Sequence, residues 1–159
     1  MKANIRKAVS SDIKVIYKLL KPFAGEGVIL ERTEDDIAGE LDKFFVAENK
    51  SGIIGVVSYY DYGRALKEVR SLAVKKDFSR KKIGSLLLKT LIESLLDLYP
   101  EAKIFTLSYS PKFFKKNGFI AVDKETFPEK IWKDCRYCKD YDKCGETALV
   151  LAKNRFSLL

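Results

Sequence analysis

The Leu-rich stretch Ile83–Leu98, with a strand-like segment on either side, is the feature that most constrains the fold. Its leucines recur at the spacing of one helical face, which predicts a long helix with a buried stripe. The stripe consists of Leu87, Leu91, Leu95 and Leu98. Ala65–Val74 precedes the helix and Lys103–Ser108 follows it, and both have the composition of strands. This order predicts a βαβ crossover between parallel strands.

The N-terminal third predicts a strand and two helices. Ala3–Val9 alternates as a short strand does, and Ser10–Asp12 can cap the helix that follows and ends near Pro22. The apolar positions of that helix are Ile13, Ile16, Tyr17 and Leu20. Thr33 with Asp36 resembles a capping box. It opens a second short helix that carries Ile37 and Leu41.

The remaining elements are short, and turn residues separate them. Further strands are predicted at Phe44–Glu48, Ile53–Tyr60, Phe119–Val122 and Thr147–Ala152, and a short helix at Pro111–Asn117. Gly118 suits the left-handed position after that helix. The order combines antiparallel meanders with one crossover, so we predict an α+β fold with a single mixed sheet flanked by helices. We expect one domain over residues 1–159, with 132–145 as an insertion before the last strand.

Charge and composition exclude several classes of function. The chain has no histidine, which excludes Ser-His-Asp and Cys-His catalysis and His-ligated zinc enzymes. A net charge of +8 favours anionic partners without choosing among them. No recognised RNA motif occurs, so we expect no nucleic-acid partner. The charged N-terminus and the lack of long apolar stretches predict a cytoplasmic protein that does not enter a membrane.

Three cysteines gather in one late segment, Cys135, Cys138 and Cys144. Their odd number does not suit a secreted disulfide framework. The spacing of the first two is compatible with a metal site, with reduced thiols or with a redox-sensitive pair, and we assign no metal.

The polar loop before the long helix carries the clearest sign of a ligand. A helix N-terminus offers unpaired main-chain N–H groups that bind phosphates. Three cations stand just ahead of it, and Gly84 and Ser85 follow. The cations are Arg80, Lys81 and Lys82. The alternative is a solvated basic loop.

The stretch EVRSLAVKKDFSRKKIGSLLLKTLI resembles the acetyl-CoA core of the GNAT acetyltransferase family, and FFKKNGF resembles its later FYEKLGF motif. Two family positions differ, because Ser79 replaces Arg or Gln and Lys82 replaces the first Gly. The resemblance implies acetyl-CoA as acetyl donor and main-chain contacts from the end of the preceding strand. The implied coenzyme-binding residues are Leu72, Ala73, Val74, Ser79, Arg80, Lys81, Lys82, Ile83, Gly84, Ser85 and Phe114.

Two residues are candidates for proton transfer. Glu68 is a candidate base, and we expect it to share a strand face with Leu66, Arg70, Leu72 and Val74; the family resemblance supports this role. The alternative is a surface ion pair with Arg70. Phe114 stands where the family often has a tyrosine acid toward the departing thiolate. Tyr109 is then the nearest substitute, unless it is a buried apolar residue.

The first forty-five residues resemble the acetyltransferase domain of N-acetylglutamate synthases, through G-x-x-x-x-R, E-L-D-K-F and the later PEKIWKDC of short forms. The resemblance implies acetyl transfer to the α-amino group of glutamate in arginine biosynthesis. It places Arg32 and Lys43 near the substrate carboxylates, which both side chains suit. The alternatives are a helix-flanking salt bridge for Arg32 and an exposed edge lysine for Lys43.

Other functions stay open at this point. The acceptor could be glutamine, another amino acid or a peptide, and a catalytically degenerate acyl-CoA-binding regulatory module also fits the substituted loop. A homodimer is left open.

Overall fold

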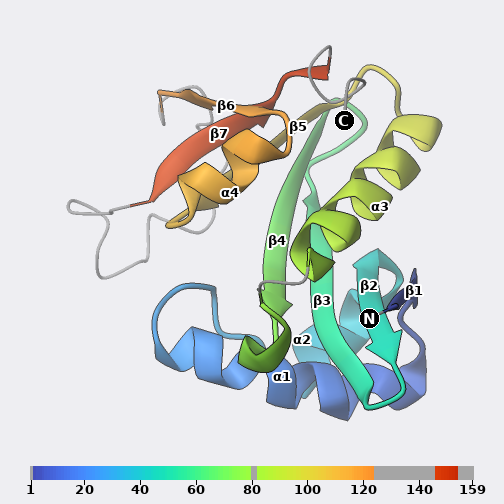
Figure 1. Ribbon diagram of the computed structural model, residues 1–159. Helices are drawn as coiled ribbons and strands as arrows, with labels where there is room; N and C mark the ends of the chain where they lie inside the picture. Colours follow the sequence, from blue (N-terminus) through green and yellow to red (C-terminus); the bar gives the residue numbers. More distant parts are fainter. Residues whose placement is uncertain (1, 80–81, 124–145, 154–159) are drawn as a thin grey trace.

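One seven-stranded sheet organises the chain in the computed structural model, which describes residues 2–79, 82–123 and 146–153 (Figure 1). The strand order is β1-β2-β3-β4-β5-β7-β6. The strands are β1 (Asn4–Lys7), β2 (Phe44–Asn49), β3 (Gly52–Asp61), β4 (Leu66–Val74), β5 (Lys103–Ser108), β6 (Phe119–Val122) and β7 (Thr147–Leu151). The α-helices are α1 (Ile13–Gly25), α2 (Glu34–Gly39), α3 (Ile83–Leu98) and α4 (Pro111–Lys116).

The predicted crossover is confirmed, since β4 and β5 are parallel and α3 connects them. All other strand pairs are antiparallel, so the sheet is mixed as expected. Leu87, Leu91 and Leu95 are buried, but Leu98 is 66% exposed, so its place in the buried stripe was predicted wrongly. Leu98 is the last residue of α3, directly before its C-cap Tyr99.

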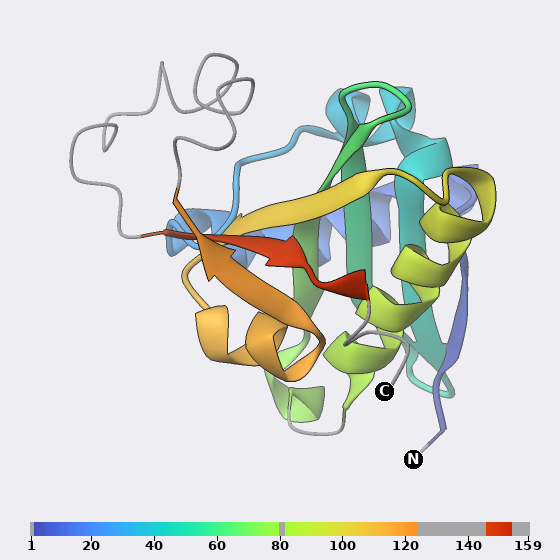
Figure 2. The ribbon, with the colours of Figure 1, turned by 90° about the horizontal axis from the view of Figure 1, so that it is seen from above.

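The two faces of the sheet carry separate cores. Figure 2 shows α1 and α2 on one face and α3 and α4 on the other. Gly55 of β3 permits the close approach of α3, because a Cβ there would lie 2.9 Å from Leu87 Cδ1. In the described ranges, no helix is both long and apolar enough to cross a membrane.

Helix α1 is longer than predicted, because it continues through Pro22 to Gly25. Proline removes one intrahelical donor but leaves its own carbonyl available. Glu26 N–H donates to that carbonyl at 3.0 Å, and Phe23 packs against the core on the α1 face. Packing and the resumed hydrogen bonds therefore outweigh the proline.

The capping box of α2 is confirmed. Asp36 N–H donates to Thr33 Oγ1 at 3.0 Å, and Thr33 N–H donates to Asp36 Oδ2 at 2.9 Å. The helix ends at Gly39, so Leu41 lies outside it, contrary to the prediction, and begins a 3-10 turn that ends at Lys43. This turn places Lys43 directly before β2.

A bulge in β4 overturns the predicted strand face. Ser58 pairs with Arg70 but Val56 pairs with Ala73, so β4 carries one extra residue there. Ser71, in the bulge, has a φ of 51°. An extra residue reverses the alternation of side chains. Glu68 and Arg70 therefore lie on the face opposite α3, whereas Leu72 and Val74 pack against the core on the α3 face.

Candidate functional site

A buried ion pair on β4 forms the centre of the site. Glu68 is 2% exposed, and Arg70 Nε donates to its Oε1 at 2.6 Å. The Arg70 guanidinium lies over the Tyr60 ring at 4.3 Å and donates to the Tyr62 hydroxyl at 3.2 Å. The Tyr62 hydroxyl is 3.5 Å from Glu68 Oε1. The Glu68–Arg70 pair is thus present, but it is buried rather than exposed at the surface.

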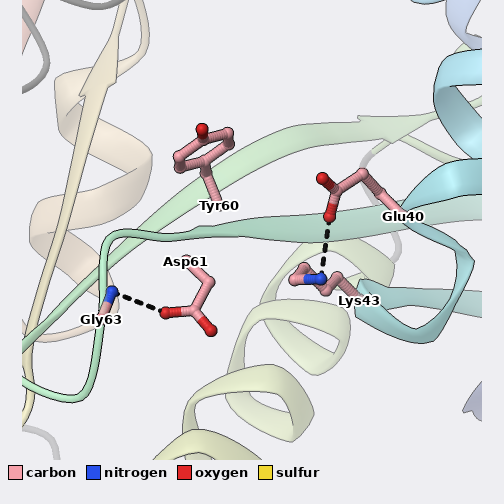
Figure 3. A pocket seen from close by; sticks show the side chains of 5 residues that line it. All are labelled: Glu40, Lys43, Tyr60, Asp61 and Gly63. Carbon is pink, nitrogen blue, oxygen red and sulfur yellow. Dashed lines mark hydrogen bonds and ion pairs between the residues drawn. The ribbon is translucent and has the colours of Figure 1, made fainter.

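Tyr60, over which Arg70 lies, also lines a pocket of about 360 Å³ (Figure 3). Its lining residues are Glu40, Lys43, Tyr60, Asp61 and Gly63. Tyr60 connects the two features, since it lines the pocket, stacks with Arg70 and lies opposite Glu68 in the sheet. The site therefore combines a candidate base with a cavity large enough for a small polar molecule.

Lys43 enters this pocket already paired. Its Nζ lies 2.9 Å from Glu40 Oε2 (Figure 3). It also lies 3.6 Å from Asp42 Oδ1. The hydrogen bond to Glu40 raises the pKa of Lys43, with smaller contributions from the surrounding charges. Lys43 is therefore a fixed positive charge, for which an anionic ligand would have to compete with Glu40.

Asp61 supplies a second fixed charge to the pocket. Its Oδ1 accepts from Lys67 Nζ at 2.6 Å and from Gly63 N–H at 2.8 Å. The hydrogen bond from Lys67 lowers the pKa of Asp61 below its ordinary value. Lys67 itself is 1% exposed and lies over the Tyr99 ring at 4.0 Å. Asp61 and Lys67 thus form a pair with its cation inside the protein and its anion at the pocket.

Arg32 lies in the segment before α2 and is half-buried. The Thr33 main-chain N–H, followed by the Thr33 hydroxyl, lowers the pKa of Asp36, and attraction to Arg32 adds a smaller effect. Arg32 does not line the pocket. The structure therefore brings Lys43 to the cavity, whereas Arg32 is placed beside the first turn of α2.

The loop before α3 contains Lys82, which stands where the resembled family has a glycine. Lys82, the N-cap of α3, has φ 61° and ψ 14°, the left-handed conformation that glycine adopts without strain. Ser79 Oγ donates to Lys76 O at 3.0 Å. The predicted phosphate-binding residues Arg80 and Lys81 lie outside the described residues.

The start of α3 packs closely on α4. A Cβ at Gly84 would lie 3.3 Å from the Phe113 ring, so glycine permits this contact. Asn117 Nδ2 donates to Ser85 Oγ at 3.3 Å. Phe114 is 5% exposed and packs edge-on against Phe113, so its ring belongs to the core.

The other predicted coenzyme residues lie where β4 ends and α3 begins. Ala73 and Ile83 are buried, and Leu72 and Val74 are half-buried. Their main-chain groups, rather than their side chains, are suited to contact a ligand there. Tyr109 is 44% exposed in the loop after β5, so the alternative of a buried tyrosine is wrong.

Several residues of this site were missed at the level of sequence. Asp61 and Tyr62 follow the predicted strand Ile53–Tyr60 and were not named as candidates, but β3 extends to Asp61. The alternation of Ser58 and Tyr60 along β3 could have indicated that Tyr60 faces the same side as Glu68. The cysteine segment lies outside the described residues, and within the described ones no group of three or more His, Cys, Asp or Glu could hold a metal.

Substitutions at Lys82 separate backbone strain from charge. We expect Lys82→Gly to raise Tm by about 2–4 °C over Lys82→Ala, because only glycine relieves the left-handed conformation, worth about 1 kcal/mol. Both variants remove the charge, so both should bind acetyl-CoA equally, a few fold more weakly than the parent chain. Thermal unfolding and calorimetric titration measure the two effects. Equal Tm values for Lys82→Gly and Lys82→Ala would show that the backbone at this position is not strained.

The part of the chain that contains the pocket and Glu68 matches a known protein family. Residues 40–121 match the family model described as the acetyltransferase (GNAT) domain. An uncharacterized N-acetyltransferase of Chlorobaculum tepidum is 37% identical over 146 residues, which are 92% of this chain and 94% of the relative. An amino-acid acetyltransferase of Buchnera aphidicola is 30% identical over 92% of this chain, which spans only 33% of that relative.

Among solved structures, the N-acetylglutamate synthase of Neisseria gonorrhoeae, complexed with coenzyme A and N-acetyl-glutamate, superposes with a TM-score of 0.83. It is 24% identical, and the match covers 95% of this chain and 35% of that one. At this identity, the similarity establishes the fold.

Proposed function

Because the chain belongs to the GNAT acetyltransferase family, we propose that it transfers acetyl from acetyl-CoA to the α-amino group of an amino acid, with glutamate as acceptor. The observation that carries this proposal is the buried Glu68–Arg70 pair, which contacts Tyr60, a residue of the polar pocket. The amino-acid acetyltransferase relatives and the complexed synthase support an amino-acid acceptor. The proposal includes a step of arginine biosynthesis in the cytoplasm and leaves a homodimer open.

The donor is proposed to lie between the end of β4 and the start of α3. The first N–H groups of a helix have no intrahelical partner, and those of α3 favour the coenzyme phosphates, aided by Lys82. The pairing of β4 with β5 ends at Glu68, so the main chain of β4 beyond it can bind the pantetheine arm. A main-chain N–H at this edge would polarise the thioester carbonyl.

The chemistry forms one bond and breaks one. The acceptor amine attacks the thioester carbon, an amide C–N bond forms and the C–S bond breaks. Glu68 takes the proton that the amine loses, directly or through a water molecule. The departing thiolate takes a proton from Tyr109 or from solvent. Arg70 fixes the position of the Glu68 carboxylate through the 2.6 Å hydrogen bond.

Lys43 is the proposed contact for an acceptor carboxylate, since it lines the pocket, and Arg32 is proposed for the other one. A second class of acceptor is favoured by a different observation. The pocket presents two carboxylates, Glu40 and Asp61, beside the single cation Lys43. This balance of charges suits an amino acid with an uncharged side chain, or a peptide, better than an acceptor such as glutamate that carries a second carboxylate.

The proposed function is tested by thiol release from acetyl-CoA across a panel of acceptors. The panel contains glutamate, glutamine, other amino acids and short peptides. Turnover with glutamate above all others supports the first proposal, and a preference for glutamine or a peptide supports the second. Binding of acetyl-CoA without turnover of any acceptor would overturn both and indicate a regulatory module.

The Lys43–Glu40 pair gives a sharper prediction for acceptor binding. We expect Lys43→Met to raise KM for glutamate by about tenfold or more, because a charged hydrogen bond worth about 1.5–3 kcal/mol is lost. Glu40→Gln should lower the same KM, because Glu40 no longer competes for Lys43. Lys89→Met, an exposed lysine on α3, is the matched control. Unchanged KM values in both pocket variants would remove Lys43 from the acceptor site.

A further inference from the structure

Thr106 stands where β4 and β5 stop pairing. The parallel register ends at Glu68↔Phe105, although both strands continue. A regular continuation would place Val69 opposite Thr106. The strands instead start side by side and then separate (Figure 1). Thr106 is therefore the first residue of β5 beyond its last pair with β4.

The side chain of Thr106 replaces main-chain pairing at this point. Its Oγ1 donates to Val69 O at 3.0 Å, and the residue is 3% exposed. A buried carbonyl needs a donor, and in a regular ladder a main-chain N–H of the next strand supplies one. With a hydroxyl as donor, the carbonyl is satisfied while β5 is free to diverge from the ladder spacing of about 4.8 Å.

The carbonyl that accepts this hydrogen bond belongs to Val69, next to the candidate base in β4. Val69 directly follows Glu68, the candidate base, and comes two residues before Ser71, whose φ of 51° belongs to the bulge. On its other edge β4 pairs with β3 at Glu68, Val69 and Arg70, before the bulge. The Thr106 hydrogen bond thus links β5 to β4 between the candidate base and the strand edge beyond it.

We propose that Thr106 is a positioning residue of the acyl-donor site. Its hydroxyl fixes the point at which β4 and β5 separate, and with it the main-chain edge of β4 that receives the pantetheine arm. This inference rests on the proposed use of acetyl-CoA but not on the identity of the acceptor. Without the hydroxyl, the Val69 carbonyl loses its donor and this edge is no longer held in one geometry.

The test compares variants that differ in the hydroxyl alone. Thr106→Val keeps the shape, and Thr106→Ser keeps the donor. By calorimetric titration of acetyl-CoA, we expect Thr106→Val to raise Kd by about tenfold and Thr106→Ser to stay within about twofold. KM for acetyl-CoA should follow Kd, while KM for the acceptor stays unchanged. Thr90→Val removes a comparable hydroxyl-to-carbonyl bond within α3, at 2.9 Å, and should leave Kd unchanged.

The outcomes separate this inference from the proposed function. A parent chain that does not bind acetyl-CoA overturns the donor proposal itself. A parent chain that binds, with Thr106→Val equally tight, overturns only the role of Thr106. An equal rise in Kd in Thr106→Val and Thr106→Ser also overturns the role of Thr106, because the effect would then come from packing and not from the hydroxyl. If Thr106→Val does not fold, Thr106→Ser and Thr106→Ala differ by the hydroxyl alone, and equal Kd values for them overturn the inference.

Discussion

Glu68→Gln is expected to lower kcat by about 10²–10⁴-fold and to leave the Kd for acetyl-CoA within about twofold. A general base contributes about this much to a proton-transfer step, and glutamine cannot accept the proton. Glutamine keeps an oxygen that can accept the 2.6 Å hydrogen bond from Arg70 Nε, so the geometry of the pair is retained as far as a substitution allows. Steady-state kinetics with the best acceptor of the panel, together with calorimetric titration, measures both quantities.

The controls for this prediction separate chemistry from folding. Glu93→Gln makes the same change on the exposed side of α3 and should leave kcat unchanged. Far-UV circular dichroism and Tm report whether Glu68→Gln folds, since Glu68 is buried beside Arg70. A well-folded Glu68→Gln with the parent kcat across the pH range would show that Glu68 is not the base. The pair would then have a structural role only.

Asp61→Asn is expected to lower the free energy of unfolding by about 2–3 kcal/mol, which corresponds to a Tm lower by roughly 4–12 °C. Removing the carboxylate leaves the Lys67 ammonium, which is 1% exposed, without its 2.6 Å partner. A fully buried pair would lose about 3–5 kcal/mol, and the partial exposure of Asp61 reduces this. Thermal unfolding measures the effect.

A double-mutant cycle isolates this ion pair. Lys67→Met combined with Asp61→Asn removes both charges, so the double variant should be more stable than Asp61→Asn alone. Tyr99, over which Lys67 lies, remains available to pack on the methionine. A double variant whose loss equals the sum of the two single losses would show that the charges do not interact.

The Asp61–Lys67 pair is also expected to make the free energy of unfolding depend on pH in the acid range. The Lys67 hydrogen bond lowers the pKa of Asp61 in the folded chain, whereas the unfolded chain has the ordinary value near 4. The unfolded chain therefore binds the proton first as pH falls. The stabilisation is fully present above about pH 4–5 and is lost as pH falls through the folded pKa. Unfolding free energies of Asp61→Asn should depend less steeply on pH in this acid range.

The elements with strong local signals were predictable from the sequence. Helix α3 and strand β5 have the predicted bounds, because a leucine stripe and an apolar run define them locally. The capping box at Thr33 was predictable because its two hydrogen bonds span only three residues. Pro22 misled the prediction of α1, since the packing of Phe23 outweighs a local helix breaker.

The site was predictable only in part, for physical reasons. Glu68 and Lys43 were named as candidates from the strand and the family resemblance, and Arg70 was named as a possible partner of Glu68. Only the structure shows that this pair is buried and that Lys43 pairs with Glu40. The bulge at Ser71 cannot be inferred from alternation, because one extra residue exchanges the faces of all the residues that follow. The Asp61–Lys67 pair likewise depends on the register between β3 and β4.

The sequence by itself determined the βαβ unit, the polar loop before α3 and the absence of histidine, because periodicity, loop chemistry and composition are local properties of the chain. Only the tertiary structure decided that Glu68 is buried with Arg70, that Lys43 shares its pocket with Glu40 and Asp61, and that a threonine hydroxyl bridges β4 and β5 where they separate. These contacts join strands and loops whose relative positions depend on sheet register and on the bulge. Registers arise from the packing of both cores together, and no single segment specifies them.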